Sequence, residues 1–301
     1  MKKKKRIVEC VPNFSEGKDL TKIEKIVEPF KNKEGVKLLG YERDADYNRV
    51  VVTVIGEPEP LKEAVIEAMG VAIEEIDMRK HQGQHPRMGA IDVAPFIPIK
   101  NFNMEEAISL SKEVAKISSK KYQLPIFLYE KSATSPQREN LSEIRKGEFE
   151  GMAEKIKKPE WKPDYGPTEI HPTAGVTAIG VRAPLIAYNI NLGTNNLEIA
   201  NHIARSIRNK NGGLRYCKAM GVELKDRGIV QVSINMTDYT KTPLYRAFEL
   251  VRVEAKRYGV NIIGSEIIGF APLEALVDSA AYYLGLERFS TEQILEVRMT
   301  E

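Results

Sequence analysis

Residues 49–76 read RVVVTVIGEPEPLKEAVIEAMGVAIEEI, and this stretch carries the pattern from which the fold is inferred. Residues 49–55 are a nearly continuous apolar run, which is typical of a buried β-strand. Beyond Gly56, apolar residues recur with the spacing of one helix face. They are Leu61, Val65, Ala68, Met69, Ala72 and Ile76. The stretch therefore predicts a strand at 49–55 followed by a helix at 59–76.

The same alternation extends outward in both directions. In the first half we expect further strands at 7–14, 36–41, 88–97 and 125–129, with helices at 20–30 and 104–121. In the second half we expect strands at 185–191, 214–224, 229–236 and 261–268, with helices at 195–208, 244–258 and 273–284. Each half reads β-α-β-β-α-β, with additions in the first, which is the order of ferredoxin-like folds.

The predicted fold class is therefore α/β, of the α+β type. It has two ferredoxin-like lobes, at 1–181 and 182–301, each a mainly antiparallel sheet with helices on one face. Between the lobes, residues 159–175 read PEWKPDYGPTEIHPTAG, and the four prolines and two glycines exclude regular structure. The aromatic residues Trp161 and Tyr165 either pin this linker down or line a ligand cleft, since ligand sites favour domain interfaces.

Composition excludes several classes of function. The 301 residues are 42% hydrophobic and 29% charged, as in soluble globular proteins, and no apolar run approaches the roughly 18 residues that span a bilayer. A net charge of +3 is too small to indicate nucleic-acid binding. The basic run at 2–6 is better explained as a solvated terminus than as a site for RNA or lipid, and the apolar segment after it is too short and too polar for a signal peptide. We expect a cytoplasmic protein with no membrane or nucleic-acid partner, in which the two distant cysteines, Cys10 and Cys217, are small buried hydrophobes.

A loop dense in titratable and backbone-bending residues runs through 79–95, RKHQGQHPRMGAIDVAP. Catalytic groups concentrate on such loops, and the usual pKa of histidine, about 6.5, suits proton transfer near neutral pH. Proline after His85 favours an extended backbone there, and Gly83 and Gly89 allow a ligand to approach closely. His85 is therefore either a general acid–base, helped by Arg87 and Asp92, or a histidine hydrogen-bonded into its loop.

A metal site is the rival interpretation of this loop. His81 and His85 are four residues apart, and Asp92 is a possible third ligand. However, Gly83 and the proline after His85 oppose the continuous helix that would aim both rings at one ion. We therefore predict no metal.

Two other segments each allow two interpretations. In the turn at 44–49, Asp and Asn can simply satisfy their own backbone, or Asn48 and Arg49 can orient a substrate carboxylate. In the segment at 262–272, Gly264 and Gly269 interrupt an apolar strand, which indicates a bulge or the close approach of a ligand. No phosphate-binding glycine loop or nucleophile elbow is present in the sequence.

Several segments, taken in order, resemble one family, the glutamate formiminotransferases. They are VECVPNFSEG at 8–17, the Asn48-Arg49 pair, HPRMGAIDVAPFIP at 85–98, DYGP at 164–167 and NINL at 189–192. The likeness covers essentially the whole chain past Arg6, and the stretches at 8–17 and 85–98 are long and specific.

This resemblance implies an enzyme of histidine degradation that moves a formimino group from N-formimino-L-glutamate to N5 of tetrahydrofolate, a co-substrate, and releases glutamate. It implies two α/β subdomains with folate in a cleft between them, and a homodimer. It carries the family's catalytic histidine over to His85. The folate-binding stretch carries over to Gly166, Pro167, Thr168, Glu169, Ile170, His171, Pro172, Thr173, Ala174 and Gly175.

Other functions remain compatible with the same site. The transferred group can be formyl, as in a glutamate N-formyltransferase or in an ATP-dependent 5-formyltetrahydrofolate cyclo-ligase, although no phosphate loop supports the latter. A non-catalytic folate-binding module is a different class. For the enzyme, we expect Asp92 or another carboxylate to orient the ring of His85, and Arg87 or Arg49 to bind a glutamate carboxylate.

Overall fold

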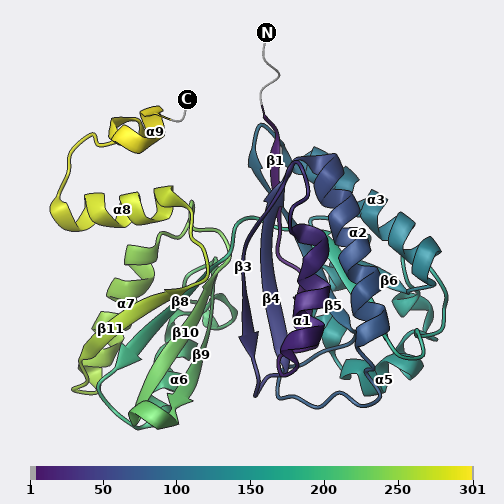
Figure 1. The fold of residues 1–301 in the computed structure, drawn as a ribbon. Coiled ribbons are helices and arrows are strands. Elements are labelled where there is room, and N and C mark those ends of the chain that lie inside the picture. Colours follow the sequence, from purple (N-terminus) through teal and green to yellow (C-terminus); the bar gives the residue numbers. More distant parts are fainter. Residues whose placement is uncertain (1–4, 300–301) are drawn as a thin grey trace. The chain divides into compact units, whose positions relative to one another are not determined.

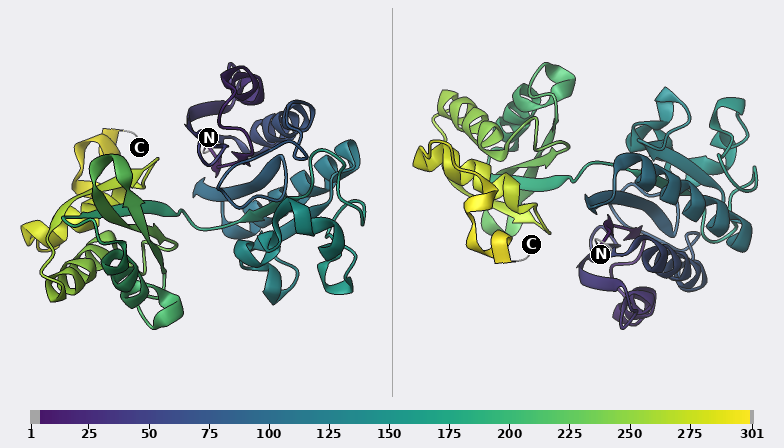
Figure 2. Two further views of the ribbon diagram at one scale, coloured as in Figure 1. Left: turned by 90° about the horizontal axis from the view of Figure 1, so that it is seen from below. Right: turned by 90° about the horizontal axis from the view of Figure 1, so that it is seen from above.

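The computed structural model describes residues 5–299, apart from the side chain of Asp226, and divides into one unit that ends at Arg182 and another that begins at Ala183 (Figure 1). Figure 2 shows the first unit in purple to teal and the second in green to yellow. Lys2, Lys3 and Lys4 of the basic run lie outside the described residues, and Arg6 pairs with Glu106. Among the described residues, no helix is both long and apolar enough to cross a membrane.

The first unit is built on one seven-stranded sheet. Its strands are β1 (Ile7–Cys10), β2 (Asn13–Phe14), β3 (Val36–Asp44), β4 (Arg49–Gly56), β5 (Ile91–Lys100), β6 (Ile126–Glu130) and β7 (Thr177–Val181). Both β1 and β2 pair antiparallel with β4 and with β5, so they act as one interrupted strand. With β3 beyond β4, this part has the strand order of a ferredoxin-like fold, as predicted.

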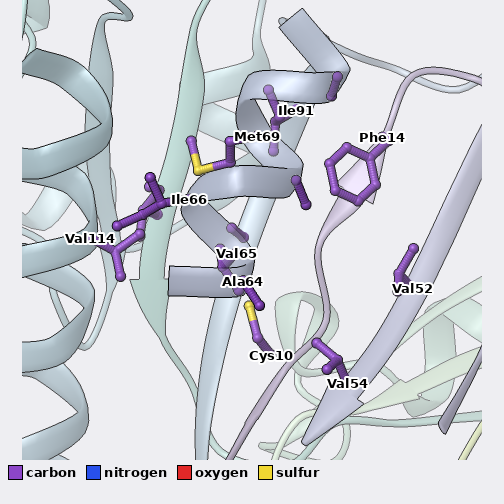
Figure 3. Packing of buried hydrophobic residues seen from close by; sticks show 14 of the residues in the cluster. Cys10, Phe14, Val52, Val54, Ala64, Val65, Ile66, Met69, Ile91 and Val114 are labelled. Atoms are coloured by element: carbon purple, nitrogen blue, oxygen red, sulfur yellow. The ribbon is translucent and has the colours of Figure 1, made fainter. Parts of the chain in front are cut away.

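Helices α1 (Leu20–Val27), α2 (Pro58–Glu75) and α3 (Met104–Tyr122) pack on one face of this sheet. Alternate residues of β4 are fully buried, and Figure 3 shows two of them, Val52 and Val54, with Cys10 and with Ala64 of α2. Because side chains alternate across a strand, the residues on this face are brought together and form the main core of the first unit.

The second face of the sheet differs from the prediction that each lobe carries helices on one face only. Beyond β5, β7 and then β6 continue the sheet in parallel. Helices α4 (Leu141–Arg145) and α5 (Glu148–Lys155) cover the other face here, because Ile144 and Met152 pack on Phe127 and Tyr129 of β6. These helices have five and eight residues, which is too short for helical periodicity to be recognised in the sequence.

The proline-rich sequence of residues 159–175 predicts a linker between the two units. In the structure these residues belong to the first unit. The Ile126 N–H donates to Tyr165 O (2.9 Å), and the Met78 N–H to Thr173 O (2.8 Å). Trp161 lies edge-on against Phe127, with 6.4 Å between the ring centroids. Of the two interpretations of these aromatic residues, the structure therefore favours pinning of the segment, which then continues directly into β7, a strand absent from the prediction.

The second unit confirms the predicted ferredoxin-like order. It comprises β8 (Ile186–Leu192), α6 (Leu197–Ile207), β9 (Cys217–Leu224), β10 (Ile229–Met236), α7 (Leu244–Arg257), β11 (Ile262–Ile268), α8 (Leu273–Leu284) and α9 (Leu295–Met299). Its sheet is antiparallel throughout, in the order β11-β8-β10-β9, and α6 and α7 pack on one face (Figure 1). The strand register of β11 shifts between Ile262 and Gly264, so the bulge interpretation of this segment is confirmed.

Short 3-10 turns complete the two units, at Glu28–Phe30, Pro136–Arg138, Pro159–Trp161, Asn209–Asn211, Lys225–Arg227 and Thr291–Gln293. Both cysteines are free and buried, as predicted. Burial raises the pKa of the Cys217 thiol to about 12 and that of the Cys10 thiol well above its ordinary value, so both are poor nucleophiles near neutral pH.

Replacing Leu61 by Ala should lower the free energy of unfolding of the first unit by about 2–5 kcal/mol, because it leaves a cavity in the main core. Leu20→Ala deletes the same atoms from a side chain that is 53% exposed, so its effect should stay within about 0.5 kcal/mol. The single tryptophan, Trp161, lies in the first unit, and its fluorescence during urea unfolding measures both variants. Equal losses in the two variants would contradict this packing.

Candidate active site

The loop between α2 and β5 is fastened to the rest of the first unit at its ends. The Ala90 N–H donates to Ala174 O (2.9 Å), and the Ser15 hydroxyl donates to Gly89 O (2.8 Å). A Cβ at Gly89 would lie 2.1 Å from the carbonyl oxygen of Val176, so only glycine fits there. The chain after His85 is therefore held against the segment that leads into β7.

Asn48 ties this loop to two other segments. Its φ of +49° places it in the left-handed region, which asparagine tolerates better than most residues. Its side-chain oxygen accepts from the Gly17 N–H (2.9 Å), and its side-chain nitrogen donates to Gln82 O (2.9 Å). Asn48 is buried. Besides reversing the chain, it therefore holds the neighbouring segments in place through its side-chain hydrogen bonds.

The imidazole of His85 lies against Arg49, the first residue of β4. Arg49 Nη1 is 2.8 Å from His85 Nε2 and 3.3 Å from the side-chain oxygen of Asn13. A guanidinium has no acceptor, so Nε2 must accept this hydrogen bond with its lone pair. The proton of the neutral ring is then on Nδ1. The ring of Tyr47 lies beside the imidazole, with 5.9 Å between centroids.

The surroundings of His85 keep its ring uncharged. Burial is the largest cause, followed by the positive charges of Arg49 and Arg145, and together they lower the pKa of His85 to about 3. Near neutral pH the side chain is therefore a neutral imidazole, which is the form that accepts a proton.

Asp92 has partners other than the histidine it was predicted to orient. One carboxylate oxygen accepts from the Met88 N–H (3.0 Å), and the other pairs with Arg145 of α4. Asp92 is almost completely buried, so it holds the backbone three residues after His85. Arg145 was missed by the sequence analysis.

Arg87, a candidate for carboxylate binding, is already paired with carboxylates of α5. Its guanidinium donates to both oxygens of Glu150 (2.6 and 2.8 Å) and to Glu148 (2.8 Å). The Arg87 guanidinium also donates to Nδ1 of His81 (3.3 Å). The other ring nitrogen of His81, Nε2, lies 2.9 Å from the carbonyl oxygen of Asn48. His81 is thus a neighbour that braces the loop. Among the described residues, no group of three His, Cys, Asp or Glu side chains is arranged to hold a metal ion.

Arg49, by contrast, lacks an anion. Burial and the nearby charge of Arg145 lower its pKa, and among the described side chains it forms no ion pair. Its Nε is buried without a hydrogen-bond partner. A cation that is partly withdrawn from water without a counter-ion is unfavourable, and a buried, unsatisfied polar atom such as Nε needs an explanation. A negatively charged ligand would supply one.

The predicted folate-binding stretch forms a compact turn that ends beside the His85 loop. The backbones of His171 and Gly175 bond to each other in both directions (3.0 Å each), and His171 Nδ1 accepts from the Ala174 N–H (3.0 Å). Gly175 bridges to Gly89. The exposed residues of the stretch, which are free to meet a ligand, are Gly166, Thr168, Glu169 and Pro172.

A surface cavity of about 670 Å³ is lined by part of the His85 loop, including His81 and Arg87, and by the start of α5. Its volume is within the range of small-molecule sites, roughly 300–1,000 Å³.

Comparison with known families decides the assignment. The model of the formiminotransferase domain, N-terminal subdomain, matches residues 7–182, and that of the formiminotransferase domain matches residues 187–300. The chain belongs to the formiminotransferase family. The resemblance inferred from its motifs is thereby confirmed.

Relatives within the formiminotransferase family match along nearly the whole chain. A glutamate formimidoyltransferase of Streptococcus pyogenes serotype M1 is 53% identical over 97% of this chain and 98% of its own length. One of Thermoplasma acidophilum is 44% identical over 97% of both chains. A formimidoyltransferase-cyclodeaminase of Dictyostelium discoideum is 42% identical over 98% of this chain but 56% of its own length.

Substitutions at Asn48 should separate its two structural roles. Asn48→Gly keeps the left-handed backbone but loses both side-chain hydrogen bonds, which should cost about 1–3 kcal/mol. Asn48→Ala should cost about 1–2 kcal/mol more, because a Cβ is disfavoured at this φ. Urea unfolding followed by Trp161 fluorescence measures both. An alanine variant as stable as the glycine variant would contradict the strained turn.

The lowered pKa of His85 predicts a pH dependence. Unfolded histidine binds a proton below about pH 6.5, whereas native His85 does so only near pH 3. The contribution of His85 to stability is therefore full above pH 6.5 and declines as the pH falls from 6.5 toward 3. NMR titration of ¹³C-labelled histidine should show the ring of His85 neutral down to about pH 4. A midpoint near 6.5 would refute the buried, cation-flanked site.

Proposed function

We propose that this chain transfers the formimino group of N-formimino-L-glutamate to N5 of tetrahydrofolate and releases L-glutamate. The observation that carries the proposal is the neutral, partly buried His85 set beside Arg49, a partly buried arginine without a carboxylate partner among the described side chains. Membership of the formiminotransferase family supports the reaction class, as do the two relatives named glutamate formimidoyltransferase.

His85 serves as the general acid–base of this reaction. N5 of tetrahydrofolate adds to the formimino carbon, and the N5–C bond forms as the C=N π pair moves onto nitrogen. His85 Nε2 takes the proton from N5 and returns it to the glutamate nitrogen. The electron pair on the formimino nitrogen then re-forms the C=N bond as the bond between the carbon and the glutamate nitrogen breaks. The formimino group remains on N5. Proton transfer of this kind typically contributes about 10²- to 10⁴-fold in rate, and holding both reactants together contributes further.

Arg49 binds a carboxylate of the donor substrate. Its free hydrogen-bonding capacity and missing counter-ion suit an anionic ligand, and the guanidinium fork matches a carboxylate in geometry. Arg87 is the weaker candidate, because Glu148 and Glu150 already occupy it.

Tetrahydrofolate, the co-substrate, contacts the stretch from Gly166 to Gly175, whose end lies against the loop that carries His85. Trp161 is not assigned to the pterin, since Lys155 Nζ lies 4.0 Å from its ring centroid and Phe127 packs against it. A homodimer and a cytoplasmic location remain predictions from the sequence.

Purified protein incubated with tetrahydrofolate and formiminoglutamate should release glutamate, detected by mass. Formylglutamate in place of formiminoglutamate tests the formyl alternative, and glutamate release from it alone would replace the proposal. His85→Ala should slow release by about 10²- to 10⁴-fold while tetrahydrofolate still binds. His202→Ala, in α6 of the second unit, removes a histidine that is not among the proposed site residues and should have no effect. Wild-type turnover in the His85 variant would rule out the proposed proton transfer.

A further inference from the structure

The hydrogen bond between Arg49 and His85 occupies the atom that the reaction needs. Nε2 accepts from Arg49 Nη1 at 2.8 Å, and a neutral imidazole has only one ring lone pair for a proton. As long as this bond is intact, His85 cannot take a proton from N5 of tetrahydrofolate. We call His85 masked in this state, because the lone pair of its Nε2 is occupied by Arg49.

Arg49 has more to gain from an anion than from the imidazole. Its Nε is buried without a partner, and it makes no ion pair among the described side chains. The nearest candidate anion on β5, Asp92, is engaged by Arg145 and the Met88 N–H. A carboxylate offers the guanidinium an opposite charge and two acceptor oxygens that match its fork, whereas the neutral ring of His85 offers one acceptor. An incoming carboxylate therefore competes effectively with the ring of His85.

We propose that a carboxylate of the donor substrate draws the Arg49 guanidinium away from Nε2 of His85, so that His85 becomes a base only when an acidic donor is bound. This inference rests on the proposed function and deepens it. Arg49 thereby determines specificity, because a neutral amidine that lacks a carboxylate leaves the histidine masked. The ligand class is a dicarboxylate the size of glutamate.

The charged and titratable groups around His85 come from five segments. They are Arg49 at the start of β4, Arg145 of α4, Tyr47 of the turn before β4, His81 of the same loop, and Asp92 of β5, which is paired with Arg145. A bound carboxylate cancels the charge of Arg49 alone. Burial and Arg145 persist, so the pKa of His85 rises without returning to its ordinary value.

The test is an NMR titration of ¹³C-labelled histidine in the full-length protein, with glutarate as the probe and its neutral diamide, glutaramide, as the matched control. Saturating glutarate should raise the pKa of His85 by about 1 or more, a tenfold change in the protonation equilibrium. Glutaramide should leave it unchanged.

Two variants link the response to Arg49. In Arg49→Gln the pKa of His85 should be raised without any ligand and should not respond further to glutarate. Arg49→Lys keeps the positive charge, so the pKa of His85 should stay low and still rise with glutarate. Trp161 fluorescence verifies that each variant is folded.

The inference is overturned if saturating glutarate leaves the pKa of wild-type His85 unchanged, if glutarate does not bind, or if glutaramide acts as glutarate does. Any of these results alongside normal glutamate release from formiminoglutamate would leave the proposed function intact. Failure of glutamate release alongside the expected pKa response would refute the function and not the masking.

Discussion

The hydrogen bond from Arg49 to His85 joins residues 36 positions apart in the sequence, and the rest of the site is arranged around it. Arg49 is placed by β4, whose alternate residues are buried in the main core. His85 is placed by a loop that Asn48 holds on one side and Asp92 on the other. Each partner is thus positioned by a separate part of the first unit. We expect the two side chains to stay paired until a ligand replaces one of them as the partner of the other.

Two features of this site lower the stability of the folded protein. Withdrawing part of a guanidinium from water without a counter-ion is unfavourable, and Asn48 adopts a left-handed conformation. Features of this kind persist only where the surroundings over-determine them, and they cluster at functional sites. Here β5 provides those surroundings, since every residue from Ile91 to Ile97 is buried. The unpaired arginine in turn helps to keep the imidazole neutral, together with burial and Arg145.

Most of the fold was predictable because hydrophobic periodicity is a local signal. The second unit follows the predicted element order, and the stretch at 49–76 forms β4 and α2 with ends shifted by one residue. The strand β7 was missed because the proline-rich stretch before it is typical of a linker. The backbone hydrogen bonds that this stretch accepts from Ile126 and Met78 are tertiary contacts that no local pattern encodes.

The residues of the candidate site could be proposed from the sequence, but their pairings could not. The density of His, Gly and Pro around His85 is typical of a functional loop, and the family resemblance selects that histidine as the candidate. Nothing near Arg87 in the sequence shows that carboxylates 61 and 63 positions later occupy it. Likewise, Asp92 lies 53 positions before the arginine that engages it. The group that contacts the imidazole is therefore Arg49 and not Asp92. Of the two arginines expected to bind a carboxylate, Arg87 is already paired and Arg49 is not, among the described side chains.

The ¹⁵N NMR spectrum of the His85 imidazole at neutral pH tests the central claim most directly, because it reports which ring nitrogen carries the proton. The account predicts a neutral ring in the ligand-free protein, protonated on Nδ1, with Nε2 as the acceptor. A charged ring, or a neutral ring protonated on Nε2, would contradict it, since in neither form can Nε2 accept a hydrogen bond from Arg49.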